Sequence, residues 1–293
     1  MDLVVNILEQ ASLFGLVAMG VYITYKILDF PDLSVEGSYP LGASIVAILL
    51  VNGVNPWVAT FVALLGGAGA GFLTAFLHVK LKITNLMSGI LVMMGLYSIN
   101  LTIMGKSNTP LFNTEHIFKL NISPLIIAAI ILVAFKVLQD IFMKTKLGFL
   151  LFAVGDNEQV VTSLGVNKGN IKILGLMVSN ALVALAGALT AQYQGYADVG
   201  MGTGVVVKGL ACVIIGTSLI GRISFIKSTS QVIIGTIIYY GAISLALKLG
   251  LSPNLLNLLT AVVIVVALCS ESNIFKMKKK AKVKDGVLED VKG

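Results

Sequence analysis

"PLIIAAIILVAF", residues 124–135, is apolar at every position. A strand of a membrane barrel alternates apolar with polar residues, so this run favours a helix surrounded by lipid or by other helices. The run "LLTAVVIVVALC", residues 258–269, has the same character. Hydrophobic residues make up 57% of the chain and charged residues 12%, and the mean hydropathy is +0.95. The chain is therefore predicted to lie in a bilayer.

Working outward from residues 124–135, similar apolar runs recur at short intervals. A helix needs roughly 20 such residues to cross about 30 Å of hydrocarbon. The predicted spans are 8–25, 38–52, 55–78, 85–104, 122–143, 171–193, 205–220, 228–248 and 254–271. We expect an all-α integral membrane protein, a polytopic bundle of about 8–10 transmembrane helices. This domain covers residues 1–274 and precedes a Lys-rich tail, 275–293.

Basic residues predict the orientation of these spans. With the tail in the cytoplasm, nine basic residues fall in cytoplasmic loops and three outside, as positively charged cytoplasmic loops require. The cytoplasmic set is Lys26, Lys80, Lys82, Lys144, Lys146, Lys168, Lys172, Arg222 and Lys227, and the outer set is Lys106, Lys119 and Lys248. The net charge of +7 is explained by this distribution. No nucleic-acid partner is expected, and the tail is expected to contact lipid head groups.

Two predicted spans carry glycines and a charge at membrane depth, in the segments 33–45, which also contains Pro40, and 200–216. Irregular backbone is tolerated in a membrane only where protein or a cavity surrounds it. Their glycines have a similar spacing, and the two spans are five helices apart in order, which gives them opposite orientations. This favours an inverted repeat, as in many transporters.

The longest polar interruption is "TKLGFLLFAVGDNEQVVTSLGVNKGN", residues 145–170, within a predicted cytoplasmic loop, 144–170. It contains the pattern of a short amphipathic helix, which is marginal in water without a partner. Its acidic and amide polar face does not suit a lipid surface, so a protein partner is favoured. Asp156 or Asn157 can cap this helix, Val160, Val161 and Leu164 share one face, and Gly165 ends it.

Four segments carry a family resemblance. They are "DLSVEGSYPLGA" (32–43), "AVGDNEQVVTSLGVN" (153–167), "GLMVSNALVALAGALTAQYQGYADVGMG" (175–202) and "VIIGTSLIG" (213–221). The chain resembles, over about residues 10–270, the permease subunits of bacterial ABC importers of the branched-chain amino acid and ribose type. Within that type it is most similar to permeases that work with tryptophan- or tyrosine-type binding lipoproteins.

The resemblance implies that residues 153–167 dock in a groove of a separate ABC ATPase. It also implies a permease homodimer in the bacterial cytoplasmic membrane, supplied with solute by an extracellular substrate-binding lipoprotein. The expected coupling residues are Gly155, Asp156, Asn157, Glu158, Val161, Leu164 and Gly165. We expect a bulky residue at 155, or Lys at 158, to uncouple hydrolysis from transport in a folded chain.

The chain is not expected to be an enzyme. Its nearest match to a phosphate-binding loop, "MGKS" (104–107), has Asn100 where the first Gly is needed, so ATP and Mg are expected on the partner. His78 and His116 are far apart, with no metal-ligand spacing around them, and no cofactor of the chain itself is expected. Cys212 and Cys269 lie in apolar runs and are expected to be unpaired.

Polar residues within the spans are candidates for a substrate pathway, since polar groups are costly in hydrocarbon. The candidates are Ser98, Asn100, Ser179, Asn180 and Gln192. Hydrogen bonds that only join helices are the alternative for each of them. Lys208 also falls within a predicted span, while Lys136 lies close enough to a span end for its ammonium to reach water.

Asp29, Asp32 and Glu36 are expected to form a solvated turn around Pro31, with contacts to basic residues of the ATPase as the alternative. No predicted span has Asp or Glu at its centre, which counts against an ion-coupled secondary transporter. That class stays as the alternative. An aromatic or branched-chain amino acid is the expected solute, with sugars and nucleosides left open.

Overall fold

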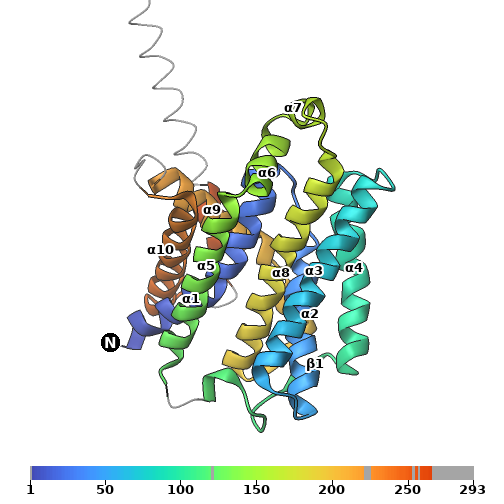
Figure 1. Ribbon diagram of the computed structural model, residues 1–293. Coiled ribbons are helices and arrows are strands. Elements are labelled where there is room, and N and C mark those ends of the chain that lie inside the picture. The colour runs from blue at the N-terminus through green and yellow to red at the C-terminus, as the bar shows by residue number, and fades with distance from the viewer. Residues whose placement is uncertain (1, 120–121, 221–225, 253–254, 257, 266–293) are drawn as a thin grey trace, which may run out of the picture.

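The computed structural model describes residues 2–119, 122–220, 226–252, 255–256 and 258–265. Within them, seven helices are long and apolar enough to cross a membrane, and α2 is a shorter apolar helix. The helices run side by side in one bundle (Figure 1). The all-α membrane fold is confirmed. The tail 275–293, Arg222, Cys269 and the end of the predicted span 254–271 lie outside the described residues.

The elements follow the predicted spans closely. The predicted bounds 85–104, 205–220 and 228–248 are those of α4, α9 and α10, whereas α1 begins earlier than predicted and continues into a π-helical turn, η1. In order they are α1 (Asp2–Val21), η1 (Tyr22–Ile27), α2 (Val35–Val51), α3 (Pro56–Val79), α4 (Asn85–Met104), β1 (Asn108–Pro110), η2 (Ile117–Lys119), α5 (Pro124–Met143), α6 (Lys146–Asp156), α7 (Glu158–Ser163), α8 (Lys168–Gln194), β2 (Tyr196–Asp198), η3 (Val199–Gly202), α9 (Val205–Ile220) and α10 (Ser228–Lys248).

Local sequence signals set the ends of the long helices. The Asn55 side chain accepts a hydrogen bond from the Trp57 amide at 2.9 Å, and Pro56 opens α3. Both are favourable at a helix N-terminus, because Pro lacks a donor and Asn satisfies one. Asn167 caps α8 in the same way, and Gly195 ends it with a φ of +78°.

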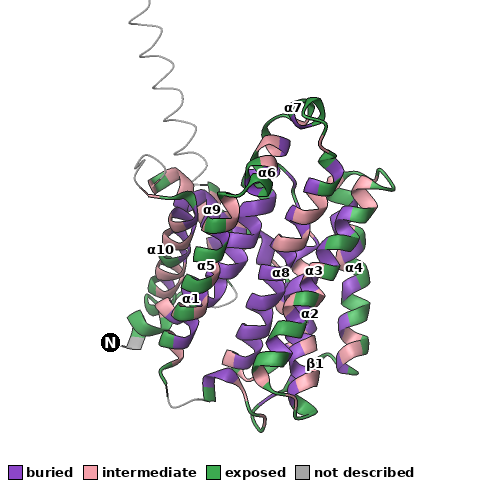
Figure 2. Cartoon of the chain, viewed as in Figure 1, coloured by how far each residue is buried: buried purple, intermediate pink, exposed green. Residues whose placement is uncertain are grey.

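The α8 helix is the central element of the bundle, and most of its length is buried (Figure 2). Glycines let it approach its neighbours closely. A Cβ added at Gly42 of α2 or Gly71 of α3 would collide with the α8 backbone, and one at Gly187 of α8 would collide with the α2 backbone. Such small-residue contacts are typical of membrane helices, because they allow backbones to touch.

The two ends of the bundle differ. At the α7 end, which is uppermost in Figure 1, α6 and α7 project beyond the long helices. At the other end, β1 and β2 form an antiparallel pair in which Asn108 lies opposite Asp198. We call this the β end.

The two spans predicted to be irregular meet at their starting points. Both α2 and α9 are regular helices, and the irregular backbone precedes them, in residues 28–34 and in η3 with its flanks. Pro40 within α2 cannot donate to the carbonyl of Glu36, and Gly202 packs against that carbonyl. The Gly204 amide donates to Glu36 Oε1 at 3.1 Å. The inverted repeat stays a prediction.

Candidate functional site

The segment expected to couple the chain to a partner folds as two helices, α6 and α7, at the α7 end. Asn157 joins them: its side chain accepts from the Gln159 amide at 2.9 Å and so caps α7. Gly165 follows α7 with a φ of +72°, a left-handed conformation that favours glycine. The predicted short helix, its cap at Asn157 and its stop at Gly165 are confirmed.

The three apolar residues of this segment do not share one face, contrary to the prediction. Val161 is fully buried against the bundle, whereas Val160 is 48% exposed and Leu164 is 65% exposed. Val161 is the one buried residue of this six-residue helix. Val160 and Leu164 are therefore left on the outer surface, beside the exposed Asp156 and Asn157.

Gly155 faces the chain itself rather than the outside. A Cβ at this position would collide with the carbonyl oxygen of Ile27, at the end of η1. A bulky residue at 155 must therefore shift α6 away from η1, which argues against the expectation that such a variant keeps its fold unchanged. A cavity of about 700 Å³ lies beside the contact, lined by residues of η1 and α6 that include Tyr25 and Phe152.

Glu158 is held by two lysines at the start of α8. Its carboxylate lies 2.6 Å from the ammonium of Lys168 and 2.6 Å from that of Lys172. Hydrogen bonds from Lys168 and Lys172 lower the pKa of Glu158 to about 2. Lys172 also lies 3.4 Å from His78 Nε2 on α3. Glu158 thus ties α7 to α8, which its acidic character alone did not reveal.

The predicted pathway residues are mostly joined in hydrogen bonds between helices. Asn180 Nδ2 donates to Asp32, Ser179 Oγ to the Gly20 carbonyl, Gln192 Nε2 to Thr60 Oγ1, and Asn100 Nδ2 to the Gly37 carbonyl. These four side chains are fully buried, while Ser98 is exposed on α4. This geometry fits the structural alternative to a substrate pathway, in which these hydrogen bonds only join helices to one another. A pathway role for these residues stays a prediction.

The solvated turn expected around Pro31 is wrong for two of its three acidic residues. Asp32 is 4% exposed and accepts from the Ser34 amide at 2.9 Å and from Asn180 Nδ2 at 2.8 Å. Glu36 is half-buried against η3. Residues 28–34 enter the bundle because these acceptors find buried donors there, which composition does not disclose. Asp32 is therefore a buried carboxylate, but it precedes α2 and does not lie at the centre of a span, so the sequence argument against ion coupling is unchanged.

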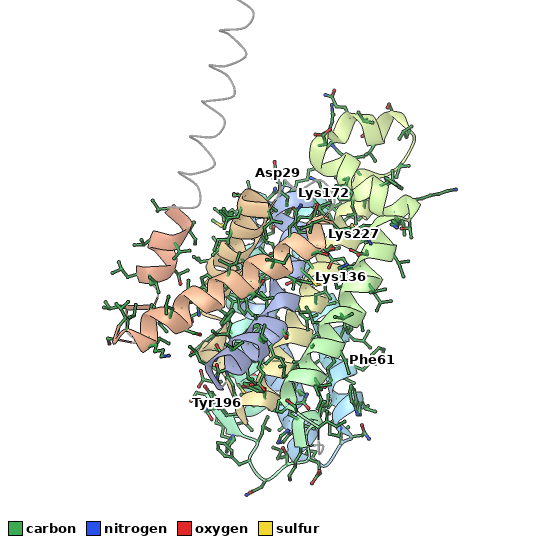
Figure 3. The ribbon with its side chains drawn as sticks, turned by 90° about the vertical axis from the view of Figure 1, so that its left-hand side faces the viewer. Asp29, Phe61, Lys136, Lys172, Tyr196 and Lys227 are labelled. Carbon is green, nitrogen blue, oxygen red and sulfur yellow. The ribbon has the colours of Figure 1, made fainter. Side chains whose placement is uncertain are left out.

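Lys136 is paired rather than reaching toward water. Its ammonium lies 2.8 Å from Asp140, which Lys227 approaches to 2.9 Å and Thr229 also contacts. Figure 3 shows Lys136 and Lys227 side by side near the α7 end. The cluster joins α5 to the start of α10.

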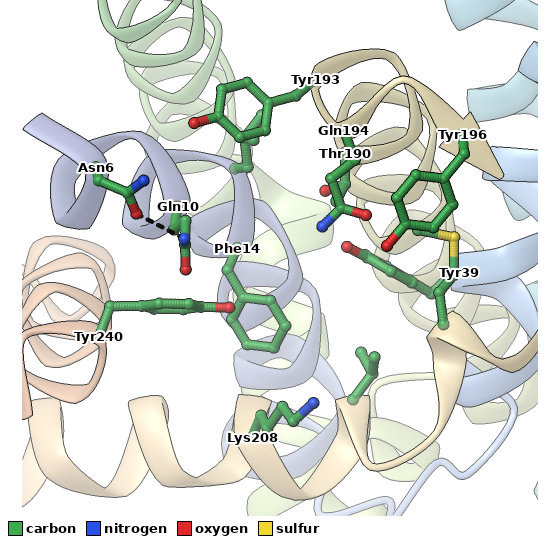
Figure 4. A pocket seen from close by; sticks show the side chains of 13 residues that line it. Asn6, Gln10, Phe14, Tyr39, Thr190, Tyr193, Gln194, Tyr196, Lys208 and Tyr240 are labelled. Carbon is green, nitrogen blue, oxygen red and sulfur yellow. Dashed lines mark hydrogen bonds between the residues drawn. The ribbon is translucent and has the colours of Figure 1, made fainter. Parts of the chain in front are cut away.

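A second cavity, which we call the tyrosine cavity, lies toward the β end and has a volume of about 370 Å³. Its walls come from α1, α2, α8, α9, α10 and the β2–η3 segment (Figure 4). The lining residues are Asn6, Gln10, Leu13, Phe14, Tyr39, Thr190, Tyr193, Gln194, Tyr196, Met201, Val205, Lys208 and Tyr240. None of the predicted pathway residues is among them.

This cavity is not visible in the sequence, because its walls come from six separate parts of the chain. One signal was present: Lys208 stands alone as a charge inside an apolar span, and an ionisable residue there marks a functional site more often than not. The aromatic character was also visible in "QYQGYADVG", residues 192–200, which contributes Tyr193 and Tyr196.

Comparison with known proteins places this geometry in context. A family model described as branched-chain amino acid transport system / permease component matches residues 3–268. The chain is 51% identical over 276 residues to the tyrosine transport system permease protein of Clostridioides difficile (strain R20291), covering 94% of each chain. It is 29% identical over 266 residues to the ribose import permease protein RbsC of Escherichia coli (strain K12), covering 87% of this chain and 77% of that one. A solved structure, PsaBC from Streptococcus pneumoniae in complex with Fab, matches with a TM-score of 0.44 and 15% identity over 82% of this chain and 89% of that chain.

Proposed function

Because this chain belongs to the branched-chain amino acid transport system permease family, we propose that it is the membrane-spanning subunit of an ABC importer for an aromatic or branched-chain amino acid. The observation that carries the proposal is the 51% identity, over 94% of both chains, to a permease named for tyrosine transport. The similarity to a ribose permease is lower, at 29%. An amino acid is therefore favoured over a sugar.

The α7 end supports a docking role for an ATPase. It exposes Val160 and Leu164 on a capped helix that projects from the bundle, and apolar side chains presented this way fit a groove on a protein partner. ATP and Mg are bound and used by that partner, and this chain transmits the resulting motion. Two copies of the chain form the translocation path, and an extracellular lipoprotein delivers solute at the β end.

Two routes lead from the docking surface to the tyrosine cavity. Glu158 ties α7 to Lys168 and Lys172 of α8, and α8 reaches the cavity with Thr190 and Tyr193. Gly155 packs α6 against η1, and α1 reaches the cavity with Asn6 and Gln10. A push on α7 therefore reaches the cavity walls through two continuous helices.

The test is purification of the tagged full-length chain from its native membrane, followed by reconstitution of the complex into vesicles. We expect an ABC ATPase and a binding lipoprotein to co-purify, and ATP to drive uptake of L-tyrosine or L-leucine. Uptake of ribose or a nucleoside alone would overturn the solute class. Uptake without ATP that collapses when a protonophore or sodium ionophore is added would favour the ion-coupled alternative, for which Asp32 would be the candidate carboxylate.

A further inference from the structure

The tyrosine cavity combines one cation with several aromatic rings. Among the 13 lining side chains, Lys208 is the charged one, and four are tyrosines. Figure 4 shows the Lys208 ammonium and the hydroxyls of Tyr39 and Tyr240 directed into the cavity. A cavity of about 370 Å³ falls in the range of small-molecule sites, which are largely apolar with a few convergent polar groups.

Lys208 is held in place but its ammonium is not paired. Its amide donates to the Gly204 carbonyl at 3.0 Å, which fixes the residue in the first turn of α9. The acidic residue that faces it, Glu36, accepts instead from the Gly204 amide at 3.1 Å. No carboxylate within the described part of the chain lies within ion-pair distance, 4.0 Å, of the Lys208 ammonium. Glu36 attracts the Lys208 ammonium from beyond ion-pair distance, so the ammonium lacks a direct contact with an anion, and an anionic group on a ligand would supply one.

The aromatic walls of the cavity suit a ring. Phe14 and Tyr240 meet edge to face with their centroids 5.5 Å apart, on α1 and α10 respectively. Tyr39 and Tyr196 close another side, and the amides of Asn6, Gln10 and Gln194 supply donors and acceptors. Aromatic walls bind a flat ring well, and amide and hydroxyl oxygens can accept from an ammonium.

We propose that the tyrosine cavity is a solute-binding site within the permease itself, in which Lys208 binds the carboxylate of an aromatic amino acid and Phe14 and Tyr240 receive its ring. The proposal rests on the proposed function for its choice of an amino acid. It goes beyond that function because selectivity then resides in this chain as well as in the binding lipoprotein.

The test is direct binding to the full-length permease in nanodiscs, with no lipoprotein present, measured by calorimetry. The probes are L-tyrosine, 3-(4-hydroxyphenyl)propionate, which keeps the carboxylate, and tyramine, which lacks it. We expect the two carboxylates to bind at least about tenfold more tightly than tyramine, and Lys208→Met to remove that difference. Lys208→Arg should retain much of it, because the charge is kept. Lys106→Met, which removes an exposed charge at the β end, is the matched control and should bind like the unaltered chain.

Three results would overturn the site: no binding of either carboxylate, tyramine binding as tightly as L-tyrosine, or carboxylate binding unchanged in Lys208→Met. ATP-driven uptake by the assembled complex distinguishes failure of the proposed site from failure of the proposed function. If uptake of L-tyrosine persists while the permease alone binds no carboxylate, the site is wrong and the function stands. If carboxylate binding depends on Lys208 but the complex takes up no amino acid, the site stands and the solute class is wrong.

Discussion

Gly155 shows how one residue can be necessary for reasons that lie elsewhere in the chain. Its place in the coupling segment predicts a role in docking, yet its contact is with the carbonyl of Ile27. Its neighbour Asn157 was predicted correctly as a cap, because a cap depends on residues two or three positions away. Contacts between residues 27 and 155 depend on how the helices pack, and a single sequence does not contain that information.

Gly155→Ala should destabilise the chain by about 1–3 kcal/mol, because its methyl group would overlap a backbone oxygen and force α6 from η1. Gly95→Ala is the matched control: Gly95 also lies within a helix, and a Cβ there meets nothing within 4 Å. Thermal unfolding of the two variants in detergent gives the comparison. Equal melting temperatures would contradict the packing described for Gly155.

At the scale of elements, α7 is a marginal helix made firm by its neighbours. Six residues are too few to be stable alone, and its cap, the buried Val161 and the ion pairs of Glu158 hold it in place. Hydropathy predicted the long helices well because each has its own apolar run. It could not predict that residues 28–34 enter the bundle, since Asp32 is stabilised there by Asn180, far away in sequence.

Glu158→Gln should loosen α7 and leave the bundle intact. Glu158 is partly exposed, so loss of its ion pairs should lower the free energy of opening α7 by only about 1 kcal/mol. Amide exchange in α7 should then be roughly fivefold faster. Because folding lowers the pKa of Glu158 from 4.5 to about 2, its stabilisation is present above pH 4.5 and is lost as the pH falls toward 2.

Hydrogen exchange of residues 158–163 measures both effects. The unaltered chain should lose protection as the pH falls through this range, and the Glu158→Gln variant should show no such step. Glu115→Gln, at an exposed ion pair of the β end, is the control and should leave α7 unaffected. Identical exchange in the Glu158→Gln variant and the unaltered chain would show that the two lysine contacts do not support α7.

At the scale of the whole molecule, the helices connect two unlike ends. The tyrosine cavity lies toward the β end, and the exposed α7 surface lies at the other. The cavity could not be predicted from sequence, because its walls assemble only when α1, α8, α9 and α10 converge. The family and the helical bundle could be predicted from sequence, because hydropathy and the motifs around residues 153–167 are local features of the chain.

The two ends should lie on opposite sides of the membrane, with α7 in the cytoplasm, because basic residues concentrate in the loops of that end. In a chain whose two cysteines are replaced by Ala, Ser163→Cys should react with an impermeant maleimide only after cells are permeabilised. Asn113→Cys, near the β end, should react in intact cells. The reverse pattern would place the docking surface outside and overturn the proposed function.

The glycines between α8 and its neighbours bear on how that helix can move. Interlocked side chains must change rotamer before one helix can slide along another, whereas Gly42, Gly71 and Gly187 present no side chain to unlock. At those contacts resistance to an axial shift of α8 is low, and it comes instead from the buried leucines of α8 and from polar tethers such as Asn180 to Asp32. Severing such a tether would lower the resistance to that shift.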